Sequence, residues 1–254
     1  MSLTKIILIL LAGTGAGFLN TVAGGGSLIA IPTLIFMGLP SAVANGTNRI
    51  ALMVQNIVAI SNFKRKGFFD FKFGLMLAGP AIVGSIVGSS LAVDLPDAIF
   101  NKVLAGVMVI VLALIVFKPQ KKLQTGPKEL TTKNKIVAML AFFFVGVYGG
   151  FIQAGVGIII IATLTLVTGM NLVRINSIKV FVVALYMVSS LAVFIINGKV
   201  NWLLGLTLAV GNAIGAWLGS TFAVEKGDKW IKILLVVAVL TMAAKLLGVF
   251  SLFT

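Results

Sequence analysis

Long apolar runs, separated by short polar or charged stretches, dominate the sequence. Several of them are as long as the roughly 20 residues that an α-helix needs to cross about 30 Å of hydrocarbon. The pattern therefore predicts an all-α, polytopic membrane protein. Helices are expected at residues 5–22, 27–38, 44–63, 72–93, 97–117, 134–154, 158–168, 173–197, 201–224 and 229–252.

The second half of the sequence repeats the pattern of the first half 131 residues later. Between residues 67–92 and 198–223, nine of 26 positions are identical. Recurring glycine and asparagine positions pair as Gly24/Gly155, Gly26/Gly157, Gly38/Gly169, Asn45/Asn176, Gly67/Gly198, Gly74/Gly205, Gly84/Gly215 and Gly88/Gly219. This predicts two homologous membrane units of about five helical segments, residues 1–117 and 136–254, with residues 118–135 as a cytoplasmic linker. Secondary transporters are commonly built in this way, with the substrate site between the copies.

Glycines interrupt one apolar run in each copy, at Gly24–Gly26 and at Gly155–Gly157. Irregular backbone inside a membrane is tolerated where protein or a watery cavity satisfies it, so each copy is predicted to contain a glycine-broken helix. If each broken segment crosses the membrane twice, the copies have five crossings each and are inverted. If it is re-entrant, they have four crossings each and are parallel. The inverted arrangement places 15 of the 20 Lys and Arg residues inside, against about 13 for the parallel one, so the positive-inside rule favours it.

Composition excludes several classes of function. With 59% hydrophobic and 10% charged residues and a mean hydropathy of +1.16, the chain cannot be an ordinary soluble domain. The net charge of +14 comes mostly from cations in short loops between apolar runs, which is the positive-inside pattern, so no nucleic-acid partner is expected. Cys and His are absent, and all six carboxylates fall in predicted loops or helix ends. We therefore expect no cofactor, no metal site and no enzymatic activity.

Two polar segments of the first copy contain residue types that recognise anions. Residues 20–27 open a helix whose free backbone N–H groups and partial positive charge suit an anion, although glycines that only allow a tight turn are the alternative. Residues 45–49 enter the next helix, and Asn45, like Asn176 in the second copy, is predicted to be an N-cap. The candidate substrate-binding residues are Asn20, Thr21, Gly24, Gly25, Gly26, Ser27, Asn45, Thr47, Asn48 and Arg49 in the first half-site, and Gln153, Gly155, Gly157, Asn176, Ser177 and Lys179 in the second.

Arg49 and Lys179 are the cations of these two half-sites. Each lies one to two turns from the end of an apolar helix, and no carboxylate is predicted nearby. Cations at membrane depth mark a pathway or a partner by default, so an anionic substrate would supply the missing counter-charge. The alternative is snorkelling, in which a long side chain carries its charge to the membrane surface.

Taken together, these features resemble the sulfite exporter TauE/SafE family of membrane permeases over residues 5–252. The resemblance rests on the segments Asn20–Ser27 and Ala44–Asn48, on Gly67 before an aromatic-rich loop, and on the duplicated halves. It implies transport of sulfur-containing anions, such as sulfite or sulfonates, across the cytoplasmic membrane.

The resulting prediction is a multi-pass protein of the cytoplasmic (inner) membrane. It would be a secondary transporter that moves a small sulfur-containing oxyanion by alternating access, with that anion and membrane lipid as its partners. An anion channel or a structural membrane subunit without coupled transport is the alternative. The sequence leaves the oligomeric state open.

Overall fold

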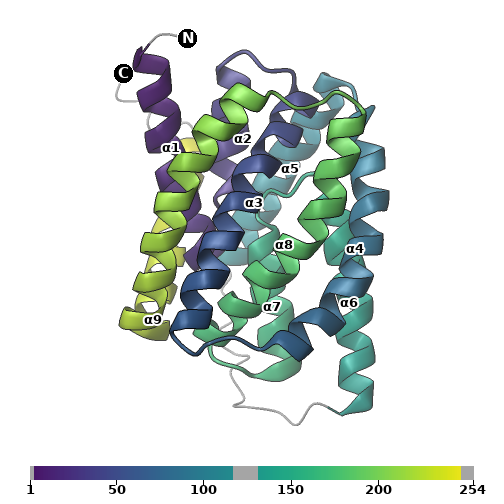
Figure 1. Cartoon of the computed structure of the whole chain (residues 1–254), viewed down its shortest axis with the longest axis vertical. Helices are drawn as coiled ribbons and strands as arrows, with labels where there is room; N and C mark the ends of the chain where they lie inside the picture. Colours follow the sequence, from purple (N-terminus) through teal and green to yellow (C-terminus); the bar gives the residue numbers. More distant parts are fainter. Residues whose placement is uncertain (1–2, 117–130, 247–254) are drawn as a thin grey trace.

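The computed structural model describes residues 3–116 and 131–246 of the 254-residue chain. Within these ranges there are nine α-helices and no strand, so the predicted all-α class is confirmed (Figure 1). The helices are α1 Leu3–Ala23, α2 Ser27–Phe36, α3 Ser41–Arg65, α4 Phe71–Val93, α5 Asp97–Val116, α6 Thr132–Phe151, α7 Val156–Thr168, α8 Leu172–Ile196 and α9 Trp202–Leu246. Five stretches are long and apolar enough to cross a membrane: α1, α4, α6, α8 and the first 25 residues of α9.

The C-terminal helices differ from the prediction. The expected helices at 201–224 and 229–252 form one helix, α9, which continues to Leu246. The charged segment between them contains no proline and a single glycine, which costs only about 1 kcal/mol inside a helix, so the helix continues through it. Residues 247–252 of the expected last helix lie outside the described ranges.

The expected linker is also shorter at its C-terminal end. Helix α6 begins at Thr132, because the hydroxyl of Thr131 accepts the backbone N–H of Asn134 at 3.3 Å and caps the helix. Residues 132–135, assigned to the linker from the sequence, are therefore helical. Residues 118–130 of the linker lie outside the described ranges.

Asn45 and Asn176 are not N-caps, which corrects the prediction from the sequence. Helix α3 already begins at Ser41, whose backbone N–H donates to Oδ1 of Asp97 in α5 at 2.9 Å. Helix α8 begins directly after Asn171, whose side chain caps it. Because the caps come from elsewhere, both asparagines lie in the second turn of a helix and their side chains reach other elements.

Equivalent helices of the two copies run in opposite directions. Helices α3 and α8 correspond by the 131-residue repeat, and Gly46 and Arg49 near the start of α3 contact Phe194 near the end of α8. In Figure 1, α3 accordingly starts at the end of the molecule where α8 finishes. Each copy also packs against the other through α1 beside α9 and α4 beside α6. Helices α3 and α8 are therefore antiparallel, as expected if the two copies are inverted.

Small residues allow these helix pairs to approach closely. A methyl group on Gly84 of α4 would lie 2.1 Å from the carbonyl oxygen of Phe143 in α6. A methyl group on the equivalent Gly215 of α9 would lie 2.0 Å from the carbonyl oxygen of Thr14 in α1. Only glycine permits such backbone contact, and small-residue stripes are a common means of helix packing in membranes. The two copies therefore use the same packing twice.

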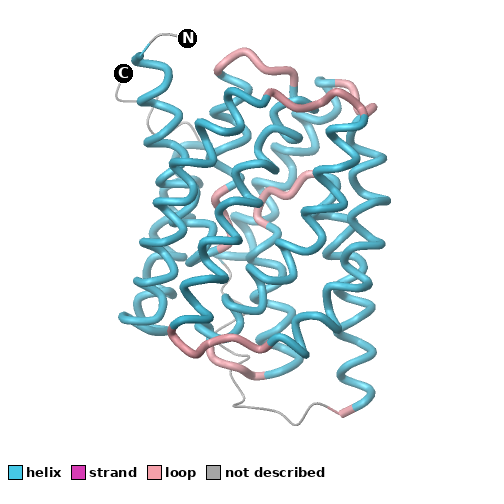
Figure 2. Tube along the Cα trace, in the orientation of Figure 1, coloured by secondary structure: helices cyan, strands magenta, loops and turns pink. Residues whose placement is uncertain are grey.

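The two broken segments turn back on themselves inside the molecule. Figure 2 shows their loops, residues 24–26 and 152–155, at mid-height among the helices. Gly26 lies so close to α1 that a methyl group on it would be 2.0 Å from the carbonyl oxygen of Ala16. Helices α2 and α7 have 10 and 13 residues, roughly 15 and 20 Å, and reach only part of the way across. The broken segments are thus re-entrant, although the two copies run in opposite directions. From the sequence, re-entrant segments were expected only with parallel copies, so this combination is neither of the two expected arrangements.

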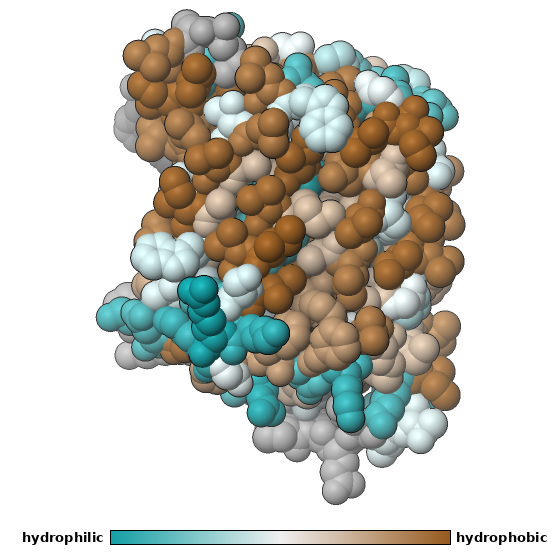
Figure 3. All heavy atoms as spheres, viewed as in Figure 1, coloured by the Kyte–Doolittle hydropathy of each residue, from teal (hydrophilic) through white to brown (hydrophobic). Residues whose placement is uncertain are grey.

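The surface is that of a membrane protein. Apolar side chains cover the middle of the molecule, and hydrophilic ones lie towards its two ends, most densely at the lower end in Figure 3. Large hydrophobic side chains such as Leu91 and Trp217 are more than half exposed, as expected where a helix faces lipid. At the C-terminal end of α3, Nζ of Lys66 lies 3.2 Å from a carboxylate oxygen of Glu225 in α9. We conclude that the chain is an integral membrane protein.

Candidate functional site

Arg49 is completely buried and binds the end of a helix from the other copy. Its Nη1 donates to the carbonyl of Gly149 at 3.1 Å, and its Nη2 donates to the carbonyl of Gly150 at 2.5 Å. Both carbonyls belong to the last turn of α6, where main-chain oxygens have no partner within the helix. The guanidinium also lies over the ring of Phe194, 4.4 Å from its centroid, in a cation–π contact.

Asn45, one turn before Arg49, completes this cap. Its Nδ2 donates to the carbonyl of Phe151 at 2.7 Å, and its Oδ1 accepts a hydrogen bond from Nη2 of Arg49 at 3.3 Å. Residues four apart lie on one face of a helix, so both side chains reach the same target. The end of α6 is therefore held by two side chains of the first copy.

Lys179 makes the reciprocal contact from α8 to the end of α1. Its Nζ donates to the carbonyls of Asn20 and Thr21, both at 2.9 Å, and to Oδ1 of Asn176 at 2.7 Å. Asn176 in turn donates from Nδ2 to the carbonyl of Val22 at 3.1 Å. Each copy thus supplies an asparagine and a cation that cap the broken helix of the other copy.

Helix geometry explains why cations occupy these positions. The carbonyls at the C-terminus of a helix carry roughly half a negative charge and stabilise a cation beside them. Arg49 is 0% and Lys179 3% exposed, so neither reaches the membrane surface and the snorkelling interpretation is wrong. Neither cation pairs with a carboxylate; the ion pair found in the described ranges joins Lys66 and Glu225. Within the described residues, the positive charges of Arg49 and Lys179 are therefore offset only partly, by the carbonyls at the helix ends.

Gly24 and Gly157 bring the two breaks into direct contact. A methyl group on Gly24 would lie 2.4 Å from Cα of Gly157, and one on Gly157 would lie 2.3 Å from Cα of Gly24. Gly24 also has a φ of +82°, which residues with a side chain rarely adopt. A tight turn and a close approach thus account for these two glycines without a ligand.

The first break contains hydrogen-bond donors without acceptors. The buried backbone N–H groups of Gly25, Gly26 and Ser27 make no hydrogen bond to any residue that the structure describes. Oγ of Ser27 lies 3.2 Å from Nδ2 of Asn48 in α3, whose Oδ1 is buried without a partner in the same ranges. Nε of Arg49 is also buried and has no hydrogen-bond partner among the described residues. Buried polar groups normally find partners, so such a group of unpaired atoms is typical of a place that a ligand or water completes.

The second break is more fully bonded. The backbone N–H groups of Val156 and Ile158 donate to the carbonyls of Gln153 and Gly155 at 3.3 and 3.0 Å. Gln153 has a φ of +62°, which is uncommon for a residue with a side chain. Its Oε1 accepts the hydroxyl of Tyr186 at 2.9 Å. A side-chain bond from α8 therefore holds a strained backbone in place.

Three predicted site residues serve other contacts. The hydroxyl of Thr47 accepts the backbone N–H of Asn201 at 2.9 Å and joins α3 to the loop before α9. The hydroxyl of Ser177 donates to the carbonyl of Arg174 at 2.9 Å, within its own helix. Thr21 takes part through its carbonyl, as described above. In the described ranges, no group of three or more His, Cys, Asp or Glu side chains could hold a metal ion.

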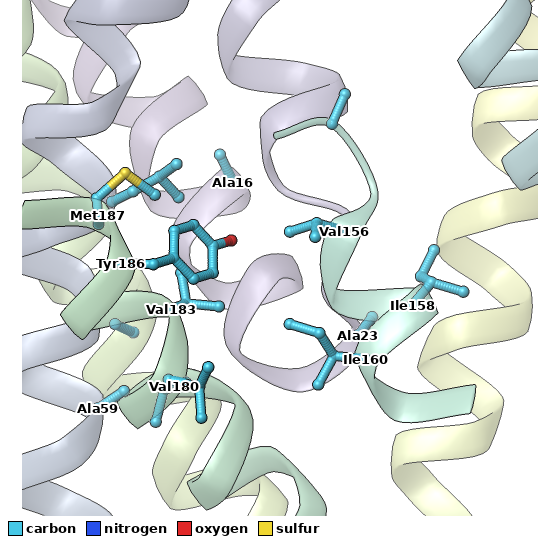
Figure 4. Close-up of a cluster of buried hydrophobic side chains, with 14 of the residues drawn as sticks. Ala16, Ala23, Ala59, Val156, Ile158, Ile160, Val180, Val183, Tyr186 and Met187 are labelled. Atoms are coloured by element: carbon cyan, nitrogen blue, oxygen red, sulfur yellow. The ribbon is translucent and has the colours of Figure 1, made fainter. Parts of the chain in front are cut away.

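Helix α8 contributes side chains that the sequence did not assign to the site. Tyr186 binds Gln153, Sδ of Met187 lies 3.8 Å from Nη1 of Arg49, and Phe194 lies under the guanidinium. Figure 4 shows Tyr186 pointing from α8 towards the segment that carries Val156. In the sequence these residues are indistinguishable from ordinary core residues of an apolar helix, and only the polar tip of a buried tyrosine is a signal.

Known proteins match the chain over nearly its whole length. The family described as sulfite exporter TauE/SafE matches residues 9–246. A probable membrane transporter protein of Haemophilus influenzae is 29% identical over 234 residues, which cover 92% of this chain and 91% of the relative. The probable membrane transporter protein YfcA of Escherichia coli is 29% identical over 232 residues, covering 91% and 86%. One from Sinorhizobium, ORF9, is 27% identical over 233 residues, covering 92% and 88%. No solved structure matches the chain at a significant level.

Proposed function

The chain belongs to the sulfite exporter TauE/SafE family of membrane transporters, and from this membership we propose that it carries a small sulfur-containing oxyanion across the cytoplasmic membrane. The proposed substrates are sulfite or an organosulfonate. The proposed mechanism is alternating access, in which the two copies move against each other around a site between them.

The observation that carries this proposal is the charge at the breaks. Arg49 and Lys179 bring two full positive charges to buried positions. The C-termini of α1 and α6 offset these by roughly half a charge each, but the N-termini of α2 and α7 begin at the same breaks and add roughly as much positive charge. A net charge of roughly +2 therefore remains, without a carboxylate paired to either cation in the described ranges. Burying unbalanced charge costs several kcal/mol, so an anion at this place is stabilised.

The donors at the breaks suit an oxyanion. An anion that leaves water must exchange its hydration for other hydrogen-bond donors. Backbone N–H groups at a helix N-terminus and a neighbouring amide and hydroxyl supply such donors, and the chain has them at Gly25–Ser27 and at Asn48. The cations then favour a negative ligand over a neutral one of the same shape.

The reciprocal caps also support movement of one copy against the other. Arg49 in α3 and Lys179 in α8 each connect a 25-residue helix of one copy to the broken helix of the other. When one copy shifts, the broken helix of the other copy, which is bonded to it, would therefore shift as well, together with the hydrogen-bond donors at that break. We propose that this coupling changes the side from which the anion has access.

Uptake into proteoliposomes tests the function. We expect the purified protein to take up radiolabelled sulfite with saturation kinetics, with competition by 2-hydroxyethanesulfonate and none by an equal concentration of chloride. Lys64→Gln, which removes an exposed cation at the end of α3, is the control and should transport normally. A flux that rises linearly with sulfite and equally with chloride would indicate a channel, and no flux of any sulfur oxyanion would refute the proposal.

A further inference from the structure

The two breaks are equivalent by the repeat but differ in chemistry. Gly25 corresponds to Val156, Ser27 to Ile158 and Asn48 to Lys179. At each pair, the first copy has a small or polar residue where the second has a bulky side chain or a cation that is already bonded. The symmetry of the fold therefore does not extend to the side chains at its centre.

Space is available beside the first break. Gly25 is buried, yet a methyl group added to it would meet only Cδ1 of Leu28, at 3.7 Å. The φ of Gly25 is not positive, so its backbone does not require glycine. Neither packing nor conformation explains the absence of a side chain here. In the second copy the side chain of Val156, 1% exposed, occupies the equivalent position.

Unpaired polar atoms lie at the same break. The N–H groups of Gly25, Gly26 and Ser27 open α2, a helix of 10 residues, and have no acceptor in the ranges that the structure describes. Asn48 is completely buried, touches Ser27 Oγ with its amide nitrogen, and leaves its Oδ1 unpartnered there. A fully buried polar side chain thus reaches the helix N-terminus and is left with an unused group.

The equivalent residues of the second copy offer much less to an anion. Ile158 donates its N–H to Gly155, and Gly157 is covered by the backbone of Gly24. Lys179, the counterpart of Asn48, directs three hydrogen bonds to Asn20 and Thr21 at the end of α1 and to Asn176 in its own helix. An ammonium has three N–H donors, so none remains for a substrate.

We propose that the anion binds at the first break alone, in the space beside Gly25, where the N–H groups of Gly25–Ser27, the hydroxyl of Ser27 and the amide of Asn48 hold its oxygens. The second break is the structural half, which keeps the first in place through the Gly24–Gly157 contact. This inference rests on the proposed anion transport and assigns it to one of the two half-sites.

Gly25→Ala gives a test in which binding and folding change in opposite directions. The added methyl fits the free protein and restricts the unfolded chain, so the melting temperature should stay the same or rise. It also occupies the space for the anion, so KM for sulfite uptake should rise roughly ten-fold or more, as expected for losing charge-assisted hydrogen bonds. Gly25→Val, which copies the second repeat, should abolish uptake.

Gly15→Ala in α1 is the matched control. Gly15 is exposed, and an added methyl meets nothing within 4 Å, so melting temperature should rise without a change in KM. Ser27→Ala and Ser89→Ala form a second pair, because both hydroxyls are buried but that of Ser89 donates to Ser85 within α4. Only Ser27→Ala should raise KM.

The outcomes separate this inference from the proposed function. An unchanged KM in Gly25→Ala and Ser27→Ala, in protein that transports sulfite, overturns the assignment to the first break and leaves the transport proposal standing. A lower melting temperature for Gly25→Ala would show that the space is filled, and would also overturn it. If the wild-type protein takes up no sulfur oxyanion, both proposals fail.

Discussion

The side-chain nitrogen of Lys179 lies 2.9 Å from the carbonyl oxygen of Asn20, a residue of the other copy 159 positions earlier in the chain. Arg49 makes the mirror contact to the end of α6. Because helix C-termini expose carbonyls that nothing in the helix can satisfy, each cation stabilises the place where the other copy is broken.

Replacing Lys179 by Met should destabilise the protein by about 1–3 kcal/mol, because three hydrogen bonds to a charged donor are lost and two buried carbonyls lose a partner. Thermal unfolding followed by tryptophan fluorescence would measure this. Lys179→Arg keeps the charge and several donors, and should recover part of the lost stability. Equal melting temperatures for Lys179→Met and wild type would contradict the capping role.

Arg49→Lys should be only partly tolerated. A guanidinium reaches two successive carbonyls with separate nitrogens and lies flat on Phe194, whereas an ammonium is a single centre without a planar face. We expect a loss of about 1–2 kcal/mol for Arg49→Lys and clearly more for Arg49→Ala. The same unfolding assay ranks the three proteins, with Lys64→Ala as an exposed control of unchanged stability. Arg49→Lys as stable as wild type would argue against the bidentate contact.

Gly24→Ala should be among the most damaging single changes in the chain. The added methyl would lie 2.4 Å from the backbone of Gly157, and the φ of +82° disfavours any side chain. Gly38→Ala separates the two causes, because Gly38 has a φ of +96° with nothing within 4 Å of an added methyl. The difference in melting temperature between the two variants therefore measures the contact between the breaks. A difference near zero would mean that the breaks do not touch.

The sequence predicted the helices and the breaks well, because their signals are local. Apolar runs of sufficient length specify membrane helices, and the glycines at 24–26 and 155–157 specify where the chain turns. The repeat added that the two breaks are equivalent. It also drew attention to Arg49 and Lys179, both of which lie at the breaks.

The partners of these residues could not be predicted from local sequence. Asn45 looked like an N-cap, but Asp97 of α5 binds the backbone of Ser41 and lets α3 begin earlier. The absence of a nearby carboxylate suggested unpartnered cations, whereas helix carbonyls of the other copy accept their hydrogen bonds. Main-chain acceptors leave no trace in residue types, so only the packing of the two copies reveals them.

Cysteine labelling can test the sidedness that the fold implies, since the chain contains no cysteine. The end of α3 and the start of α6 lie at one end of the molecule, and the loops after α4 and α8 lie at the other (Figure 1). Cysteines at Lys64 and Lys133 should therefore react with an impermeant thiol reagent from the same side, and those at Asp94 and Asn197 from the opposite side. By the positive-inside rule, we expect the first pair to face the cytoplasm. Labelling of positions 64 and 133 from different sides would rule out this topology.

Tyr186→Phe examines how the second break is held. The substitution removes one hydroxyl, which donates to Oε1 of Gln153 at 2.9 Å, and leaves that buried oxygen without this donor. We expect a loss of about 1–2 kcal/mol in stability. Gln153→Gly removes the same bond but also relieves the positive φ, which costs roughly 1 kcal/mol in a residue with a side chain, so it should be milder than Gln153→Ala. If the second break is structural, these variants should lower the melting temperature while KM for sulfite uptake stays within about two-fold of wild type. A large rise in KM at unchanged stability would instead place the substrate beside Gln153.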